Sequence, residues 1–353
     1  MATLKSLAKG FIKLSYCRLL KKRFPLNVFF VITNNCNLKC DYCYGEYYNR
    51  KHFREFTTDE ILLTLEELRR LGTVFLQLQG GEPLLRKDIH QIVNRAKELK
   101  FSLDMITNGL LVKNKIETVK LLDSICISLD GLKGSNDFNR GSGIFEKTIE
   151  AIMLCSENKI PTRLNSIITN KTTPADIDFL MDLSKKNNCL LNFCPTFEFK
   201  PLTADKSYSY FNYNREKYNE IIELIIDYKK KKYPVQFTAA AYEISKRWPF
   251  SLEKRRAEIS EIPKEYYTPK CFHGDYVCFI DSDGRLYPCC NFWNDFDDLN
   301  IHTLGFENAW NKLTRKNCSA CYIYSYIDRN LLMNLNFSTL KNYFFNALNI
   351  KMF

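Results

Sequence analysis

The sequence predicts an α/β protein in which a partial (β/α)6 barrel is followed by a small cysteine-rich domain. Two observations carry this prediction. Short apolar segments alternate six times with longer segments of helical periodicity between residues 26 and 232, a pattern typical of parallel strands joined by helices. The fourteen cysteines of the 353-residue chain gather mainly near its start and near its end, and the alternation lapses before the second group.

Each predicted unit consists of a strand followed by a helix. The first helix shows the clearest boundaries, because Thr57 and Glu60 form a capping box and Gly72 supplies a stop. The six strands are expected at residues 27–33, 74–79, 101–106, 124–129, 162–169 and 189–196. The six helices are expected at residues 57–72, 88–100, 113–122, 144–158, 174–187 and 214–232. Six units are too few for a closed eight-fold barrel, so we expect an open, TIM-like barrel with its functional loops at the carboxyl ends of the strands.

The composition of the chain is that of a globular protein, with 45% hydrophobic and 26% charged residues. Its formal charge of +11 is spread over predicted helices, which is typical of solvated faces and disfavours a nucleic-acid-binding protein. The basic N-terminus has apolar residues at helical spacing and no cleavage site of small residues, so a secretory signal is not expected. No stretch approaches the length of a membrane span. We therefore expect a cytoplasmic protein, in which clustered cysteines indicate metal ligation rather than disulfides.

The organisation along the chain has five expected parts. They are a basic amphipathic segment (1–25), the barrel (26–232), a connector (233–270), a cysteine-rich domain (271–325) and a helical tail (326–353). The two terminal parts, basic and amphipathic at residues 5–23 and aromatic at residues 322–353, are expected either to pack over the barrel or to dock on a membrane.

Three cysteines follow the first predicted strand in the stretch TNNCNLKCDYCYGEY. Cys36, Cys40 and Cys43 have the spacing C-x3-C-x2-C. A structural zinc ion needs a fourth ligand, and the nearby His52 lies outside the usual zinc-finger spacings. A [4Fe-4S] cluster held by three thiolates is the stronger interpretation, because it leaves one iron open to bind a small molecule.

Polar motifs also follow the other predicted strands, at the edge where barrel enzymes bind their ligands. Paired glycines let a ligand approach the backbone, and the carboxylate beside them can accept from an ammonium group. An arginine and an asparagine on the fifth strand suit a carboxylate or hydroxyl groups. The candidate residues are Gly80, Gly81, Glu82, Pro83, Thr107, Asn108, Ser128, Asp130, Arg163 and Asn165.

These residues together resemble the radical S-adenosylmethionine (radical SAM) enzymes. The resemblance is carried by the three cysteines with Tyr42 before the last one, and by the motifs Gly-Gly-Glu-Pro, Thr-Asn-Gly and Ser-Leu-Asp-Gly over residues 26–196. It implies that S-adenosylmethionine chelates the open iron. It further implies that Gly80 to Pro83 hold the methionyl amino group, that Ser128 and Arg163 lie near its carboxylate or ribose, and that Tyr42 holds the adenine through its backbone.

The chemistry implied by this resemblance is reductive. An electron enters the cluster, the bond between the sulfonium sulfur and the 5′ carbon breaks, and a 5′-deoxyadenosyl radical abstracts a hydrogen atom from the substrate. A reductant such as flavodoxin or ferredoxin is implied as a partner. The protein itself has to orient the substrate and exclude water.

The second group of cysteines lies in a predicted hairpin and a later C-x2-C pair. Cys271 and Cys289 flank the turn at residues 281–284, and Cys318 and Cys321 form the pair. Four thiolates suit zinc or a [4Fe-4S] cluster. The spacing resembles the C-terminal extensions called SPASM and twitch domains, which implies an auxiliary [4Fe-4S] cluster. Because Cys321 is the last cysteine, the shorter twitch form with a single auxiliary cluster is favoured.

The remaining cysteines have mainly structural interpretations. Cys278 is expected in a buried strand, and the role of Cys290 stays open because it adjoins Cys289. His273 is expected in a turn. Core positions are expected for Cys17, Cys126, Cys155, Cys189 and Cys194, of which Cys194 lies nearest the functional rim.

The substrate is left open by the sequence. A peptide, a sugar-like or other small molecule, and a lipid-linked substrate are all compatible with the motifs. The tail lacks a Gly-Gly end, which counts against a molybdenum-cofactor cyclase, and no separate N-terminal peptide-binding domain is visible. Two alternatives from other classes remain: an electron carrier with two clusters and no catalysis, and a zinc-stabilised basic nucleic-acid-binding protein.

Overall fold

The computed structural model describes residues 4–43, 45–46, 50, 54–196, 214–293, 296, 298–315 and 317–349. The chain forms two compact units, and each combines segments that are distant in sequence. The first unit contains Met1–Asn37, Tyr47–Cys126 and Phe272–Lys316. The second contains Leu38–Glu46, Ile127–Cys271 and Asn317–Phe353. The division falls inside strand β4 (Ser124–Ser128).

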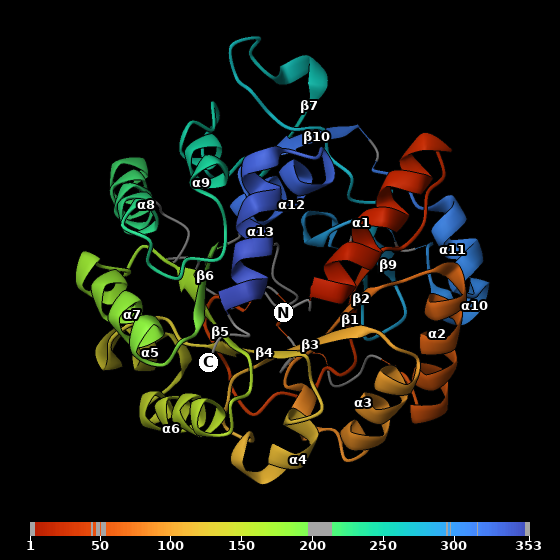
Figure 1. Cartoon of the computed structure of the whole chain (residues 1–353), viewed down its shortest axis with the longest axis horizontal. Helices are drawn as coiled ribbons and strands as arrows, with labels where there is room; N and C mark the ends of the chain where they lie inside the picture. Colours follow the sequence, from red (N-terminus) through yellow and green to blue (C-terminus); the bar gives the residue numbers. More distant parts are fainter. Residues whose placement is uncertain are drawn as a thin grey trace. The chain divides into compact units, whose positions relative to one another are not determined.

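The first unit is built on a mostly parallel sheet. Its strands are β1 (Asn27–Val31), β2 (Phe75–Gln79), β3 (Ser102–Thr107), β8 (Val277–Ile280) and β9 (Leu286–Tyr287), hydrogen-bonded in the order β3-β2-β1-β8-β9. Its helices are α1 (Leu4–Leu19), α2 (Thr58–Leu71), α3 (Ile89–Glu98), α4 (Ile116–Val119), α10 (Ile301–Leu304) and α11 (Phe306–Lys312). Short 3₁₀ turns lie at Pro83–Leu85, Lys113–Lys115 and Cys290–Phe292. Figure 1 shows β1, β2 and β3 following one another beside α2 and α3.

The second neighbour of β1 in this sheet, on the side opposite β2, was not predicted from the sequence. Strand β8 comes from the second cysteine-rich segment, yet it pairs parallel with β1 in the register Phe29↔Phe279. The two phenylalanine rings stack with their centroids 4.3 Å apart, and all four residues of β8 are buried. Burial on both faces makes β8 a central strand of the sheet rather than part of a separate hairpin.

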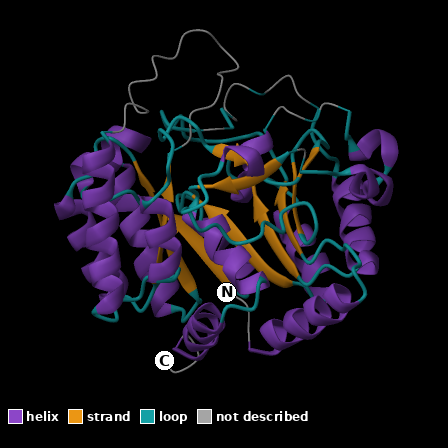
Figure 2. Ribbon diagram, turned by 90° about the horizontal axis from the view of Figure 1, so that it is seen from above, coloured by secondary structure: helices purple, strands orange, loops and turns teal. Residues whose placement is uncertain are grey.

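The second unit also contains parallel strands and the longer helices. Strands β5 (Thr162–Ile168) and β6 (Leu190–Pro195) pair in parallel, and β7 (Arg256–Glu258) pairs antiparallel with β10 (Cys318–Cys321). The helices are α5 (Lys133–Arg140), α6 (Ile144–Glu157), α7 (Pro174–Lys186), α8 (Arg215–Lys230), α9 (Ala239–Lys246), α12 (Tyr324–Met333) and α13 (Phe337–Asn349), with a 3₁₀ turn at Ile259–Glu261. Figure 2 shows helices in purple and strands in orange.

The predicted elements of the barrel are found close to their expected bounds. All six strands are present, and the α2 capping box is formed, with the Thr57 hydroxyl accepting from the Glu60 amide and the Glu60 carboxylate accepting from the Thr57 amide. Gly72 ends this helix at φ +103°. The helix expected at residues 113–122 is only a 3₁₀ turn followed by the four residues of α4. Helix α5 was not predicted.

The expected connector and cysteine-rich domain differ from the packing that the structure shows. Residues 233–270 contain α9 and β7, and Val235 makes a parallel bridge to Leu191 of β6. The segment 271–325 does not form a compact unit of its own, because the part from Phe272 to Lys316 packs with β1. The five-part division stays a prediction about domains. Within the described residues, no helix has both the length and the apolar character needed to cross a bilayer.

Candidate cofactor site

The first three cysteines lie on the loop that follows β1. Cys36, Cys40 and Cys43 are all half-buried, and the Cys43 amide donates to the Cys40 carbonyl at 3.1 Å in a tight turn. All fourteen cysteines are present as thiols. Three thiols within eight residues form a donor set whose chemistry fits an iron–sulfur cluster. Cys36 belongs to the first unit and the other two cysteines to the second.

The paired glycines after β2 allow two loops of the first unit to approach each other closely. The Gly81 amide donates to the Thr33 carbonyl at 2.9 Å, and the Glu82 amide donates to the Asn35 carbonyl at 2.7 Å. A Cβ atom on Gly81 would lie 2.4 Å from the Asn35 oxygen, and one on Gly80 would lie 2.7 Å from the Thr33 oxygen. The glycines were expected to admit a ligand. In the structure the atoms they admit belong to the backbone just before Cys36.

The Glu82 carboxylate connects the ends of β2 and β3. It is fully buried, and it accepts from the Thr107 hydroxyl at 2.8 Å, the Asn108 amide at 2.8 Å and the Leu84 amide at 3.0 Å. Burial raises the pKa of Glu82 to about 7, although these three donors pull it downward. Both carboxylate oxygens of Glu82 are thus engaged within the chain. Glu82 also caps the 3₁₀ turn that begins at Pro83, so it fixes the conformation of the motif.

Two buried amide donors at the ends of β1 and β2 lack an acceptor. Asn34 Nδ2 and Gln79 Nε2 have no hydrogen-bond partner in the described part of the chain, and the two side chains are 2% and 8% exposed. Buried polar atoms are normally satisfied, so unmatched donors indicate a missing acceptor. A ligand carboxylate or a cluster sulfide would supply one, and these residues fit the proposed cofactors in that respect.

The Asp130 carboxylate is the hub of the corresponding motif in the second unit. It accepts from the Tyr42 hydroxyl at 2.6 Å and from Nε and Nη2 of Arg140, both at 2.9 Å. The Ile167 amide on β5 donates to Asp130 Oδ1 at 3.1 Å. Burial raises the pKa of Tyr42. Burial is the largest single influence on the pKa of Arg140 and lowers it, but the charge and hydrogen bond of Asp130 together with Tyr42 and Cys40 make the net shift upward.

Helix α5 supplies the residues that sequence reasoning missed in this motif. Arg140 pairs with Asp130, and its guanidinium lies 5.5 Å from the centroid of the Tyr42 ring. The Asn139 carbonyl accepts from the Asp41 amide at 3.3 Å, between two cysteines of the first loop. No helix was predicted here, because the stretch KGSNDFNRG is polar and contains Gly134, which disfavours a helix interior.

The remaining predicted contacts of S-adenosylmethionine are buried or half-buried. Ser128 ends β4 and is 8% exposed. The Arg163 guanidinium donates to the Gln236 side-chain oxygen at 3.1 Å. The Asn165 side-chain oxygen accepts from Asn192 Nδ2 at 2.8 Å. These contacts place Arg163 and Asn165 on one face of β5, as alternation along a strand requires.

The second group of cysteines is only partly arranged as predicted. The turn at residues 281–284 does connect β8 and β9, which confirms the hairpin. Cys318 and Cys321 lie in the short strand β10 rather than in a tight loop. Among the described residues, no three His, Cys, Asp or Glu side chains converge in a geometry that would hold a metal ion, and this applies to Cys36, Cys40 and Cys43 as well as to the second group. The ligand roles of Cys271, Cys289, Cys318 and Cys321 stay a prediction.

A buried ion pair anchors the same hairpin within the first unit. Arg50 is fully buried and donates to both oxygens of Asp281 at 3.1 and 3.0 Å. Its guanidinium lies 4.5 Å from the centroid of the Trp293 ring. The Ser282 hydroxyl donates to the Asn34 side-chain oxygen at 2.6 Å. The hairpin thus contacts the loop before Cys36, a link for which the sequence carried no signal.

The structural interpretation of most other cysteines is confirmed. Burial raises the pKa of the Cys155 thiol to about 11 and that of Cys189 to about 12, which makes both unreactive. Cys194 differs, since it is half-buried and donates to the Asn165 side-chain oxygen at 3.5 Å. His273 lies in a turn, and His52 lies outside the described residues. The buried cysteines are Cys17, Cys126, Cys155, Cys189, Cys278, Cys289 and Cys290.

Comparison with known proteins agrees with this geometry. Residues 30–184 match the model of the Radical SAM superfamily. The Fe-coproporphyrin III synthase of Methanosarcina barkeri is 25% identical over 298 residues, which cover 80% of this chain and 73% of that protein. The GTP 3′,8-cyclase of Clostridium perfringens strain SM101 is 30% identical over 208 residues, covering 56% of this chain and 61% of that protein.

The solved structures show the same fold. Streptococcus suis SuiB bound to its precursor peptide SuiA aligns with a TM-score of 0.64 at 21% identity, over 84% of this chain and 67% of that one. This alignment confirms the predicted α/β class with a partial, TIM-like barrel. Residues 30–184 carry a radical SAM domain, and the relatives named above are enzymes, which supports an enzyme here. The cofactors of this family are a [4Fe-4S] cluster and S-adenosylmethionine. The assignment of Cys36, Cys40 and Cys43 as ligands of the cluster stays a prediction from their spacing.

Proposed function

We propose that this enzyme cleaves S-adenosylmethionine reductively at a [4Fe-4S] cluster held by Cys36, Cys40 and Cys43, and removes a hydrogen atom from its substrate. The observation that carries the proposal is the spacing of these three half-buried thiols on the loop after β1, within the part of the chain that matches the family model. When bound, the two cofactors supply the one-electron chemistry of hydrogen abstraction. The protein supplies orientation, charge and exclusion of water.

In the first unit, the ends of β2 and β3 and the loop before Cys36 are joined by hydrogen bonds and close packing. Glu82 fastens the end of β2 to the end of β3, and the Gly80–Gly81 backbone is pressed against the loop before Cys36. In this arrangement Gly80 to Pro83 receive the methionyl amino group through backbone carbonyls. Asn34 and Gln79 offer the two unmatched amide donors to a carboxylate or a sulfide.

The second unit contributes the remaining contacts. Ser128, Arg163 and Asn165 lie near the methionyl carboxylate and the ribose, and the backbone at Tyr42 receives the adenine. Support comes from the contact of the Tyr42 hydroxyl with Asp130, which fixes the orientation of the residue before Cys43. The Asp130 carboxylate already accepts hydrogen bonds from Tyr42 and Arg140, so Asp130 acts as a positioning residue.

An auxiliary [4Fe-4S] cluster of the twitch type completes the proposal, with Cys271, Cys289, Cys318 and Cys321 as ligands. Three of these cysteines, Cys271, Cys318 and Cys321, are half-buried outside the apolar core, which suits a donor set, whereas Cys289 is buried. A flavodoxin or ferredoxin supplies electrons. Free cysteines and iron–sulfur clusters are most stable in a reducing compartment, which favours a cytoplasmic enzyme.

The substrate class is a peptide or a small molecule. SuiB is described with the precursor peptide SuiA, and the relatives from Methanosarcina barkeri and Clostridium perfringens are named for a tetrapyrrole and for GTP. The polar face formed by Asn165 and Asn192 on β5 and β6 favours a substrate that carries hydrogen-bonding groups. Neighbouring genes and activity assays with each class would narrow this choice.

Iron analysis of cysteine variants tests the proposed function. Protein purified without oxygen is expected to hold about eight iron atoms per chain, and a Cys36→Ala, Cys40→Ala, Cys43→Ala variant about half of that. The variant should form no 5′-deoxyadenosine from S-adenosylmethionine and dithionite. A Cys126→Ala, Cys155→Ala, Cys189→Ala variant, which also removes three thiols, is the control that should keep all its iron.

Two results would contradict the proposal. Formation of 5′-deoxyadenosine by the first variant would show that these cysteines do not hold the catalytic cluster. A wild-type protein that holds two clusters but never consumes S-adenosylmethionine would instead be an electron carrier.

A further inference from the structure

Helix α1 presents two apolar faces, although only one of them packs against the protein. Gly10, Leu14 and Cys17 lie at positions i, i+4 and i+7 and are buried. Ile12, Tyr16 and Leu19 follow the same spacing two residues later and are 69%, 60% and 83% exposed. A shift of two residues turns the direction by about 200° around a helix, so the second set lies opposite the buried face.

The buried face fixes α1 firmly to the first unit. Gly10 lies directly on the Phe75 ring, where a Cβ atom would come within 2.7 Å of Cε2. The Lys13 ammonium donates to the Gly72 carbonyl at 2.9 Å and lies 5.1 Å from the centroid of the Phe24 ring. Because these contacts occupy the inner face, rotation of α1 to bury its outer stripe would cost this packing. The outer stripe is therefore a stable feature of the surface.

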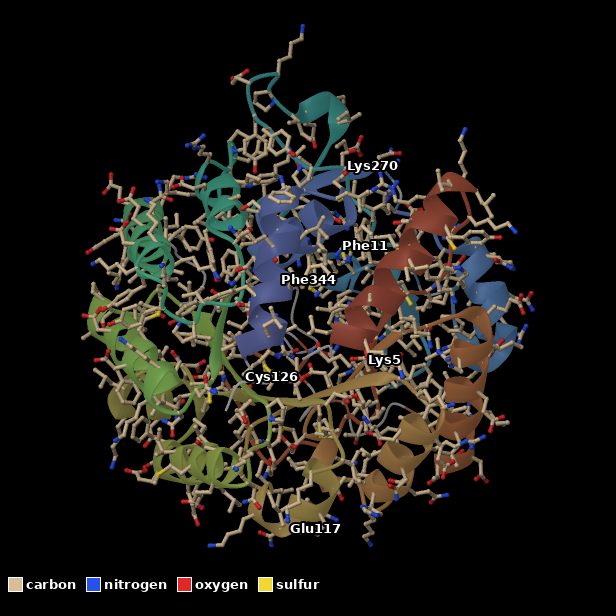
Figure 3. All side chains as sticks on the ribbon, viewed as in Figure 1. Lys5, Phe11, Glu117, Cys126, Lys270 and Phe344 are labelled. Carbon is tan, nitrogen blue, oxygen red and sulfur yellow. The ribbon has the colours of Figure 1, made fainter. Side chains whose placement is uncertain are left out.

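The outer stripe is bordered by unpaired positive charge. Residues 1–40 contain no acidic side chain, and Asp41 is the first in the chain. Lys5 and Lys9 form no ion pair within the described residues. Partial burial lowers the pKa of Lys9, and the nearby charges of Arg69 and Lys100 lower it further. Figure 3 labels Lys5 and Phe11 along this helix, and Phe11 is 38% exposed.

Exposed like charges without counter-charges are complementary to an anionic partner. Arg18 and Arg23 are excluded from this set, because Arg18 covers the Phe272 ring and Arg23 donates to the Gly274 carbonyl. Lys21 and Lys22, just beyond α1, are exposed and extend the basic surface. Lys5 and Lys9 continue the line of Ile12, Tyr16 and Leu19 toward the N-terminus, so one exposed face of α1 combines aliphatic, aromatic and cationic side chains that can lie in the interface of a membrane.

We propose that the outer face of α1, made of Ile12, Tyr16 and Leu19 and continued by Lys5 and Lys9 at its N-terminal end, docks the enzyme on a bilayer rich in anionic lipid. The helix of 16 residues is about 24 Å long, so it lies along the surface rather than across it. The apolar stripe enters the boundary between headgroups and acyl chains, and the lysines pair with lipid phosphates and carboxylates. This inference concerns only the first unit and is independent of the cofactor chemistry.

Vesicle co-sedimentation of the full chain tests this surface. Wild type should bind vesicles of phosphatidylcholine mixed with phosphatidylserine, bind pure phosphatidylcholine much more weakly, and be released by salt. A Lys5→Ala, Lys9→Ala variant should bind the mixed vesicles about 30-fold more weakly, since each lysine near an anionic surface contributes a factor of about 5. The matched control is Lys147→Ala, Lys186→Ala, which removes two exposed lysines of α6 and α7 and should bind as wild type.

The apolar stripe has its own variant and control. An Ile12→Ser, Leu19→Ser variant should bind at least about 10-fold more weakly, because two buried aliphatic side chains are lost from the bilayer. Leu63→Ser removes a leucine of α2 that is 65% exposed and should change nothing. Circular dichroism and iron content should be the same in all variants, because every substituted side chain faces solvent.

Three outcomes would overturn the proposal. The first is equal binding of the wild type and the Lys5→Ala, Lys9→Ala variant to mixed vesicles. The second is an equal loss of binding in the Lys147→Ala, Lys186→Ala control, which would assign the effect to net charge. The third is no vesicle binding by the wild type together with a dimer that the Ile12→Ser, Leu19→Ser variant converts to a monomer, which would make a second copy of the chain the occupant of this face.

Discussion

The Gly-Gly-Glu-Pro motif and the Ser-Leu-Asp-Gly motif each contain one buried carboxylate, and the two carboxylates have different hydrogen-bond donors. Glu82 in the first unit accepts only from neutral donors, one hydroxyl and two backbone amides. Asp130 in the second unit accepts from the Arg140 guanidinium as well as from Tyr42. Neutral donors orient a carboxylate but leave its buried charge uncompensated, whereas an arginine compensates the charge. The first motif is therefore sensitive to pH, and the second is sensitive to the loss of a partner.

The largest expected effect is at Arg140. An Arg140→Met variant leaves the Asp130 charge buried and unpaired, which should lower the free energy of unfolding by about 3 to 5 kcal/mol. Urea denaturation measures this loss. An Arg140→Met, Asp130→Asn double variant should recover part of the stability, because the buried charge is then removed.

The control for Arg140 is Arg95→Met, since Arg95 pairs with Glu66 and Glu98 on the surface with its own side chain 35% exposed. Surface pairs contribute about 0 to 1 kcal/mol. Equal losses in the two arginine variants would show that the pair with Asp130 does not act as a compensated buried charge.

The next effect is the pH dependence caused by Glu82. The pKa of Glu82 in the folded chain is about 7, against its ordinary value of 4.5. Between these two values the folded state keeps a proton that the unfolded state has lost. Stability should fall as pH rises from about 4.5 to about 7 and then level off, by about 3 kcal/mol in total. Glu82→Gln should remove this slope. A slope that persists unchanged in the variant would contradict the assignment.

A smaller effect is expected at Tyr42. Tyr42→Phe removes one hydrogen bond to the ionised Asp130 and should cost about 2 kcal/mol, while the pair of Asp130 with Arg140 is kept. If Tyr42 positions the loop of Cys40 and Cys43, the variant should also raise the KM for S-adenosylmethionine with its iron content unchanged. If the variant has the same stability and the same KM as the wild type, the hydrogen bond between Tyr42 and Asp130 does not position this loop.

The smallest effects compare a glycine from each motif. Gly81→Ala forces a Cβ atom against the Asn35 backbone and should cost about 1 to 3 kcal/mol. Gly134→Ala on α5 meets no atom within 4 Å and should stabilise the helix by up to about 1 kcal/mol. Thermal unfolding of both variants measures the pair. An unchanged or increased stability of the Gly81→Ala variant would contradict the close approach of the two loops in the first unit.

The elements of the barrel were predictable because each one carries its own local signal. The α2 capping box, for example, depends on Thr57, Glu60 and Gly72, which are neighbours in the chain. The motif residues were predictable for a similar reason, since they directly follow apolar strands. Helix α5 escaped prediction because its stability depends on Asp130, which lies outside the helix and pairs with its last residue.

The amino-acid sequence by itself determined the alternating strands and helices, the three-cysteine loop and the positions of the polar motifs, because these depend on periodicity and spacing along the chain. Only the tertiary structure decided that β8 pairs with β1, that Arg140 neutralises Asp130 and that α1 leaves one apolar face uncovered. The physical reason is that the sequence shows which charges and apolar surfaces are unfavourable when they are left alone. Which residue pairs with them depends on the distant segments that the folded chain brings into contact.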